Sequence, residues 1–173
     1  MQKSTLIPLI QPTKWAALTV SGFWLASCAG LAQAQNLGDV VLILHDKTNA
    51  CLDAKDFGRY GNGNPVQLWK CNGGVAQKWK IRRNGLISNE ANNLCLDAKD
   101  FGRYGNGNPV QLWQCGGDAQ RWQVRRNGSV TNAATGLCLD AKDSGTMGSG
   151  NPMQLWQCNG GTAQEWRIVP FGP

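Results

Sequence analysis

CLDAKDFGRYGNGNPVQLWKCNGGVAQKW, residues 51–79, occurs in three copies along this chain of 173 residues. The other copies are residues 95–122 and 138–166, and the first nineteen residues of the first two copies are identical. The third copy differs in its middle, where SGTMGSGNPM replaces FGRYGNGNPV. The copies start 44 and then 43 residues apart, and the residue missing from the second lies between Cys115 and Gln120. Three copies of one unit predict a body with pseudo-three-fold symmetry.

Each repeat predicts about four short β-strands, because apolar runs and alternating segments are separated by turn residues every ten residues or so. The strands expected in the first repeat are 40–44, 51–54, 65–69 and 77–81. The first is an unbroken apolar run typical of a buried strand, and His45 begins the turn after it. Residues 55–64 form a loop rich in glycine and asparagine, and Asn84-Gly85 is a hairpin signal.

The three repeats, at about 40–82, 83–125 and 126–169, therefore give an all-β domain of about twelve short strands. A four-stranded unit of this size cannot bury its own apolar face, but three units packed round an axis can. Three copies are too few for a long solenoid, so we expect them to close into a barrel-like body.

Residues 1–34 are predicted to be a secretory signal peptide. They contain Lys3, Lys14 and no acidic residue, and their apolar run 15–31 is too short to span a bilayer comfortably. The run ends at Ala32-Gln33-Ala34, a small-x-small cleavage pattern, which predicts a secreted domain of residues 35–173. An alternative is that Leu25-Ala26-Ser27-Cys28 is a bacterial lipobox, which would make the protein a lipoprotein anchored through Cys28.

The cysteine count also indicates export. Six of the seven cysteines lie in the repeats, and the odd one is Cys28, so either reading of the leader leaves an even set for disulfides. A metal site is poorly supported, because no close Cys-x-x-Cys pair is present and His45 is the only histidine. We therefore expect no metal and no cofactor.

The net charge of the whole chain is +6, and the basic residues do not form one block. We therefore expect no nucleic-acid partner, no membrane span and a monomer.

The order Cys-Leu-Asp, Asn-Gly-Asn-Pro-Val-Gln-Leu-Trp, Cys-Asn-Gly and Gln-x-Trp resembles the ricin B-type lectin repeat. The Gln-x-Trp triplets begin at Gln77, Gln120 and Gln164, in phase with the three Cys-Leu-Asp motifs. The resemblance covers roughly residues 40–169. It implies a β-trefoil, which is a six-stranded barrel capped by three hairpins.

Six cysteines allow fifteen pairings. A pseudo-three-fold body should treat its copies alike, and similar repeats often carry an internal bridge. We therefore expect one disulfide within each repeat, each contributing about 3 kcal/mol through the unfolded state. The expected pairs are Cys51–Cys71, Cys95–Cys115 and Cys138–Cys158.

Each repeat also contains the groups that a shallow sugar site needs. A carboxylate can accept from two neighbouring hydroxyls, an indole can lie against the C–H face of the sugar, and amides can donate and accept. The resemblance assigns these roles to the Asp after Cys-Leu, to the Gln and Trp of Gln-Leu-Trp, and to the Gln of Gln-x-Trp. The candidate residues are Asp53, Gln67, Trp69 and Gln77; Asp97, Gln111, Trp113 and Gln120; and Asp140, Gln154, Trp156 and Gln164.

One departure from the family pattern concerns the residue before Gln-x-Trp, which is usually Asn in binding repeats. This chain has Ala76, Ala119 and Ala163 there. A lost neutral hydrogen bond costs about 0.5–1.5 kcal/mol, or about two- to tenfold in affinity. The sites are thus expected to be weakened, altered in specificity or partly silent.

The sequence therefore predicts a secreted carbohydrate-binding lectin with up to three weak sites, each binding in the range of ~0.1–1 mM and acting together by avidity. Galactose-type glycans and xylan-like polysaccharide are both candidate ligands. The alternatives are a trefoil interaction protein, such as a protease inhibitor, and a stand-alone polysaccharide-targeting module working with a separate glycoside hydrolase. Catalysis is not expected, because no Ser-His-Asp set is evident and the three aspartates fall in separate repeats.

Overall fold

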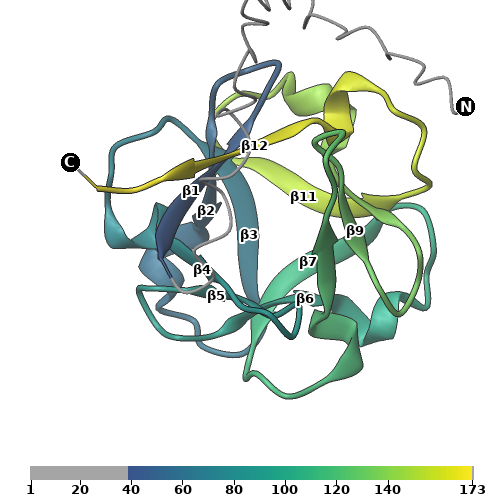
Figure 1. Ribbon diagram of the computed structural model, residues 1–173, viewed down its shortest axis with the longest axis horizontal. Helices are drawn as coiled ribbons and strands as arrows, with labels where there is room; N and C mark the ends of the chain where they lie inside the picture. The colour runs from purple at the N-terminus through teal and green to yellow at the C-terminus, as the bar shows by residue number, and fades with distance from the viewer. Residues whose placement is uncertain (1–38, 173) are drawn as a thin grey trace, which may run out of the picture. The chain divides into compact units, whose positions relative to one another are not determined.

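Each repeat contributes four β-strands to the structure. The computed structural model describes residues 39–172, and it contains twelve strands in that range (Figure 1). The first repeat supplies β1 (Val40–His45), β2 (Cys51–Ala54), β3 (Asn64–Trp69) and β4 (Trp79–Ile81). The second supplies β5 (Ile87–Asn89), β6 (Cys95–Ala98), β7 (Asn108–Trp113) and β8 (Trp122–Val124). The third supplies β9 (Val130–Asn132), β10 (Cys138–Ala141), β11 (Asn151–Trp156) and β12 (Trp166–Pro170).

Short 3-10 turns follow the second and third strands of every repeat. They are η2 (Lys55–Gly58), η3 (Val75–Gln77), η4 (Lys99–Gly102), η5 (Asp118–Gln120), η6 (Lys142–Gly145) and η7 (Thr162–Gln164).

The strands are arranged as a β-trefoil, as predicted. The second and third strands of each repeat form the antiparallel hairpins β2–β3, β6–β7 and β10–β11. The third strands β3, β7 and β11 also pair with one another, and in Figure 1 they meet around the middle of the view. The remaining strands are linked through the pairs β12–β1, β1–β4, β4–β5 and β8–β9, and an isolated bridge joins Leu86 to Arg121.

The core is built from the same positions of each repeat. Leu52 lies directly opposite Leu68 in the first hairpin, and both are fully buried. The corresponding leucines of the other hairpins are also fully buried: Leu96, Leu112, Leu139 and Leu155. Burying one leucine contributes about 1.5–3 kcal/mol, so this layer is a main source of stability.

The tryptophans of the Gln-x-Trp triplets belong to this core. Trp79, Trp122 and Trp166 are 0–4% exposed. The indole N–H of each donates to a carbonyl in the first hairpin strand of its own repeat; Trp79, for example, donates to Leu52 at 3.0 Å. These tryptophans therefore satisfy their polar atom inside the fold, as buried indoles usually do.

The three predicted disulfides are present. Cys51–Cys71, Cys95–Cys115 and Cys138–Cys158 each close a loop between residues 20 positions apart. Each bridge ties the start of a hairpin to the turn that follows it, next to the Gln-Leu-Trp segment.

Three details of the first repeat differ from the sequence-based prediction. His45 is the last residue of β1 and is fully buried, whereas it was expected in the turn. Residues 40–44 alternate between buried and half-exposed, because only one face of β1 meets the core. Gln77 lies in the turn η3, so β4 begins at Trp79 and not at residue 77.

The predicted signal peptide, residues 1–34, and Cys28 lie outside the described residues. Among residues 39–172, no helix has the length and apolar character needed to cross a membrane.

His45 occupies the place that Asn89 and Asn132 occupy in the other repeats, since all three pair with a Gln-x-Trp tryptophan. The imidazole contacts Thr48 Oγ1 through Nδ1 at 2.9 Å and the Thr162 carbonyl through Nε2 at 2.8 Å. Its ring packs 5.2 Å from the ring of Trp166. Burial lowers the pKa of His45 from its ordinary 6.5, although the hydrogen bond to Thr162 opposes this shift.

We expect His45→Asn to remove one source of acid sensitivity. Because the folded pKa is lowered, the unfolded chain takes up a proton below about pH 6.5 before the folded protein does, and stability present above that pH is lost as the pH falls. Relative to the variant, the natural protein should lose up to about 1.4 kcal/mol of unfolding free energy per pH unit. Urea unfolding at pH 7.5 and 5.5 measures this. An identical difference between the two proteins at both pH values would contradict it.

Candidate functional site

A buried carboxylate and a carboxamide face each other across every hairpin. Asp53 on β2 lies directly opposite Gln67 on β3, so both side chains are on the same face of the hairpin. The Gln67 Nε2 donates to Asp53 Oδ1 at 2.9 Å. The other repeats have the same pair at 2.9 and 2.8 Å, namely Gln111 with Asp97 and Gln154 with Asp140.

The three carboxyls share the same electrostatic environment. Burial raises the pKa of Asp53, Asp97 and Asp140 above the usual Asp value, and the hydrogen bond from the hairpin glutamine of each repeat opposes this rise. A partly desolvated carboxylate held in one orientation interacts more strongly with a hydroxyl donor than a free one does, because water competes less. The arrangement is thus suited to accepting hydrogen bonds from a polar ligand.

The tryptophan of Gln-Leu-Trp lies two positions after this glutamine and therefore points to the same side of the strand. Trp69, Trp113 and Trp156 are 41%, 43% and 38% exposed. They contrast with the Gln-x-Trp tryptophans, which are buried in the core.

The carboxylate and the exposed indole line one hollow. In the second repeat this hollow has a volume of about 540 Å³ and is lined by Asp97, Gln111 and Trp113, with Phe101 on its border. In the third repeat it has a volume of about 380 Å³ and is lined by Asp140, Gln154 and Trp156, with Ser144 in place of the phenylalanine. Both are open depressions formed by one β-hairpin and the two turns that follow its strands.

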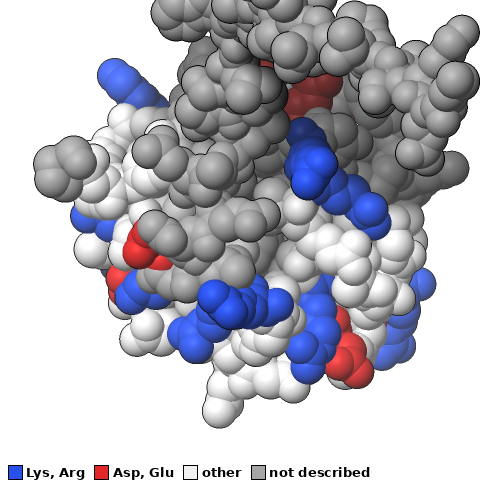
Figure 2. Space-filling model, viewed as in Figure 1, with Lys and Arg blue, Asp and Glu red and all other residues white. Residues whose placement is uncertain are grey.

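Charges outside the hollows are dispersed. Figure 2 shows Lys and Arg side chains in several separate groups over the viewed face, with acidic side chains among them. Lys80 pairs with Glu90 at 3.0 Å, and Arg121 pairs with Asp118 at 3.2 Å. Among the described residues, no group of three His, Cys, Asp or Glu side chains is placed to hold a metal ion.

A model of the ricin-type beta-trefoil lectin domain matches residues 39–166 of the chain. The chain belongs to this family.

The chain is also similar to proteins from several sources. An agglutinin from Abrus precatorius is 28% identical, with a TM-score of 0.66, over 76% of this chain and 48% of that one. The C-half of an earthworm R-type lectin, solved in complex with GalNAc, is 17% identical with a TM-score of 0.65, over 76% of this chain and 98% of that one. Serine protease 1 of Rarobacter faecitabidus is 48% identical over 42 residues, which is 24% of this chain and only 7% of the protease.

The glutamine of Gln-x-Trp has a structural position in this ricin-type lectin. Gln120 is 1% exposed; its Oε1 accepts from the Gly116 and Gly117 amides at 2.7 and 3.1 Å, and its Nε2 donates to the Gln114 carbonyl at 2.9 Å. Gln77 makes equivalent bonds to the backbone of its own turn. Both stand behind the carboxylate and shape the turn that borders the hollow.

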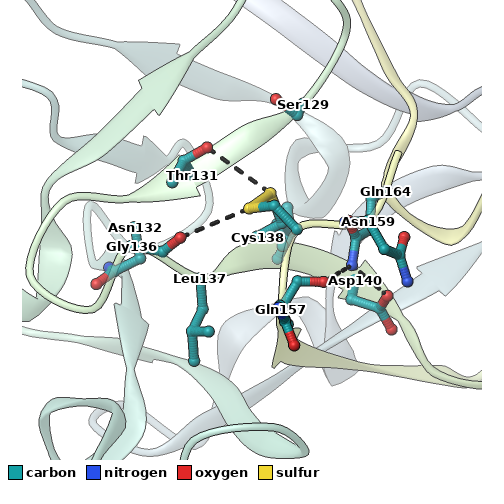
Figure 3. The surroundings of a disulfide bond; sticks show 12 residues. Ser129, Thr131, Asn132, Gly136, Leu137, Cys138, Asp140, Gln157, Asn159 and Gln164 are labelled. Atoms are coloured by element: carbon teal, nitrogen blue, oxygen red, sulfur yellow. Dashed lines mark hydrogen bonds between the residues drawn. A yellow bond between two sulfur atoms is a disulfide. The ribbon is translucent and has the colours of Figure 1, made fainter. Parts of the chain in front are cut away.

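In the third repeat the equivalent glutamine also reaches the carboxylate itself. Figure 3 shows Gln164 between Asp140 and Gln157, beside the disulfide of Cys138. Its Nε2 donates to Asp140 Oδ2 at 3.1 Å and to the Gln157 carbonyl at 3.0 Å. The three Gln-x-Trp glutamines among the twelve predicted sugar-binding residues are 0–2% exposed, and their role in sugar binding stays a prediction.

The alanines that replace the family's usual asparagine lie at the sites. Ala119 lines the hollow of the second repeat, and Ala163 lines that of the third. An alanine offers a ligand no polar side-chain group. Asn159 lines the third hollow, but its Oδ1 accepts from the Gly161 amide at 2.8 Å, so this oxygen is engaged in the turn.

The residue that organises the loop after the second strand of each repeat was not among the candidates predicted from the sequence. Asn64 is fully buried; its Oδ1 accepts from the Tyr60 amide at 3.1 Å, and its Nδ2 donates to the Lys55 and Pro65 carbonyls at 3.1 and 2.9 Å. Its counterparts in the other repeats make the same bonds. The Asn-Pro pair is unchanged in all three copies although the preceding loop varies, and this was the available signal.

The loop also presents an aromatic side chain at a strained position. Asp100 and Phe101 have φ of 50° and 58°, a region that costs non-glycine residues roughly 1–3 kcal/mol. Phe101 is nonetheless 71% exposed and borders the same hollow as Trp113. An exposed aromatic ring held in a strained backbone is typical of a binding surface.

We expect Gln120→Ala to lower the free energy of unfolding by about 1–3 kcal/mol, because it removes three hydrogen bonds that a buried side chain makes to the backbone of its turn. Gln114→Ala is the matched control, since the Gln114 side chain is exposed and should change stability by less than about 0.5 kcal/mol. Urea denaturation followed by tryptophan fluorescence compares the two. Equal stabilities would remove the structural role assigned to Gln120.

Proposed function

We propose that this protein is a carbohydrate-binding lectin that engages multivalent glycans through three shallow sites, one in each repeat, without catalysing a reaction. The observation that carries the proposal is the repeated pairing of a partly desolvated, amide-bonded carboxylate with an exposed indole in one hollow. Family membership supports carbohydrate as the ligand class.

In each site the aspartate carboxylate accepts hydrogen bonds from adjacent sugar hydroxyls. The amide of Gln67, or of Gln111 or Gln154, holds the carboxylate in place. The exposed tryptophan packs against the C–H face of the pyranose. Each hollow is open and has few polar groups, so single sites bind weakly, at roughly 0.1–1 mM, and three on one body act by avidity.

The ligand class proposed is a galactose-type glycan or a xylan-like polysaccharide. The former is proposed because an earthworm R-type lectin with the same fold was solved in complex with GalNAc. Secretion is proposed as well, because three disulfides fit an oxidising compartment and the predicted leader fits export.

A second candidate function is a polysaccharide-targeting module that works beside a separate enzyme. The observation that favours it is that one stretch of 42 residues resembles part of a protein named as a serine protease. Both candidate functions use the same sugar sites. They differ in whether binding to the carbohydrate also brings a separate enzyme close to it.

Removing the carboxylates tests both. Asp53→Asn, Asp97→Asn and Asp140→Asn keep the shape of the side chain but remove its charge, so each should weaken its own site by about tenfold or more. Each single variant should reduce binding to a multivalent glycan in part, and the triple variant should abolish it. A glycan array and insoluble polysaccharides measure this, with Asp39→Asn as the surface control. A folded triple variant that still binds normally would exclude these aspartates.

Binding should also weaken on acidification. The sites bind through ionised carboxylates, and because burial raises the pKa of Asp53, Asp97 and Asp140, protonation begins at a higher pH than the usual ~3.9 for Asp. The same raised pKa makes protonation of these groups favour the folded state, so loss of binding from this cause need not involve unfolding. Titration of binding from pH 7 to pH 4, with circular dichroism as the check on folding, measures the effect. Constant affinity across this range would argue against ionised aspartate as the acceptor.

A further inference from the structure

Each exposed tryptophan is bordered by the glycine-rich loop of a different repeat. The amide of Gln114, which directly follows Trp113, donates to Asn62 Oδ1 of the first repeat at 2.7 Å. The amide of Gln157, after Trp156, donates to Asn106 Oδ1 of the second repeat at 2.6 Å.

A third contact of the same kind joins the third repeat to the first. The amide of Lys70, after Trp69, donates to Ser149 Oγ of the third repeat at 3.0 Å. The loop of the first repeat therefore bonds beside the tryptophan of the second repeat. In the same way, the second loop bonds to the third repeat and the third loop to the first.

The residue before each tryptophan is held by the same loop. The Gly63 amide donates to the Leu112 carbonyl at 2.8 Å, and the other two loops make the same bond at 2.8 Å. Trp113 is thus bonded on both flanks, through Leu112 and Gln114, to Asn62 and Gly63 of the preceding repeat.

The glycine of this pair also lies beside the ring itself. A Cβ built on Gly63 would lie 4.0 Å from Cζ3 of Trp113, and one built on Gly150 would lie 3.9 Å from Cζ3 of Trp69. Gly63 has a φ of 89°, which favours glycine and leaves the outer edge of the indole uncovered by a side chain. The loop therefore passes near the indole edge and holds the backbone on both sides of the tryptophan.

We infer that each proposed sugar site is completed across a repeat boundary, with Asn62, Asn106 and Ser149 acting as positioning residues for Trp113, Trp156 and Trp69. This rests on the proposed function, which is what makes these tryptophans part of sugar sites. An exposed indole gains affinity from being held in place before the ligand arrives, because less freedom is lost on binding. The three sites are therefore not independent modules. A substitution in the loop of one repeat changes the sugar affinity of the site in the next repeat.

The third loop differs chemically from the other two. Ser149 is shorter than asparagine and reaches Lys70 at 3.0 Å, against 2.7 and 2.6 Å for the asparagine contacts. Trp69 in the first repeat is thus the platform held by the longest of the three bonds, although its own hairpin is identical in sequence to that of Trp113.

The test uses two proteins in which a single site is left intact. Asp53→Asn with Asp140→Asn leaves the second site, and Asp97→Asn with Asp140→Asn leaves the first. Asn62→Ala is added to each. Asn62→Asp provides the rescue, since its carboxylate also accepts from the Gln114 amide. Asn84→Ala is the matched control, because Asn84 Oδ1 accepts from the Leu86 amide at 3.2 Å in a hairpin turn instead of a loop that borders a tryptophan platform.

Two readouts are taken. Lactose and xylohexaose are titrated against each protein by NMR, and the indole N–H resonances of Trp113 and Trp69 are recorded without sugar. We expect Asn62→Ala to weaken the second-site protein by about two- to tenfold and to leave the first-site protein unchanged within about twofold. It should shift the Trp113 resonance and not that of Trp69. Asn62→Asp should restore affinity, and Asn84→Ala should alter neither readout.

Equal loss at both sites, loss at the first site alone, or no loss at either would overturn the inference. If the unsubstituted protein binds neither these probes nor the glycan panel, the proposed function fails, and the resonances alone decide the inference. A Trp113 resonance unmoved by Asn62→Ala would then overturn it, and a selective shift would sustain it.

Discussion

The two-residue alternation of the Gln-Leu-Trp hairpin is the constraint on which the rest of the structure depends. In each third strand the central leucine points inward and is fully buried, while the glutamine and tryptophan on either side point outward. The aspartate on the neighbouring strand lies opposite the glutamine and shares its outward face. One hairpin thus supplies both core residues and the three groups of a surface site.

Closure round the axis turns this hairpin into a stable unit. Strands β3, β7 and β11 pair with one another, so each outward tryptophan stands at the boundary with another repeat. The disulfides and the buried Gln-x-Trp residues fix the turn on the other side of the hollow. The paired strands, the disulfides and the buried Gln-x-Trp residues hold the surrounding backbone in place. A small surface depression can therefore present a carboxylate and an indole in one fixed arrangement.

The surroundings of the three carboxylates are not equivalent, although the repeats are nearly identical in sequence. The second repeat lacks one residue in its turn, and Gln120 accepts from two consecutive glycine amides there. The third repeat replaces the exposed phenylalanine by Ser144, and its Gln164 reaches the carboxylate directly. These differences alter the aromatic border and the polar floor while leaving the core positions alone, so the shared framework allows ligand preference to differ between sites.

The sequence by itself determined the features that depend on local spacing and repetition. The number of strands follows from alternation and from three matching copies, and the disulfides follow from treating those copies alike. The candidate aspartates and tryptophans follow from the resemblance to the ricin B-type repeat. Tertiary structure alone decided the features that depend on contacts between repeats. The burial of His45 against Trp166, and the bonds from Asn62 and Ser149 to the next repeat, join residues far apart in the chain. Their geometry is set by how the three hairpins close round the axis, and a pattern of residue types within one repeat does not encode which loop will meet which strand.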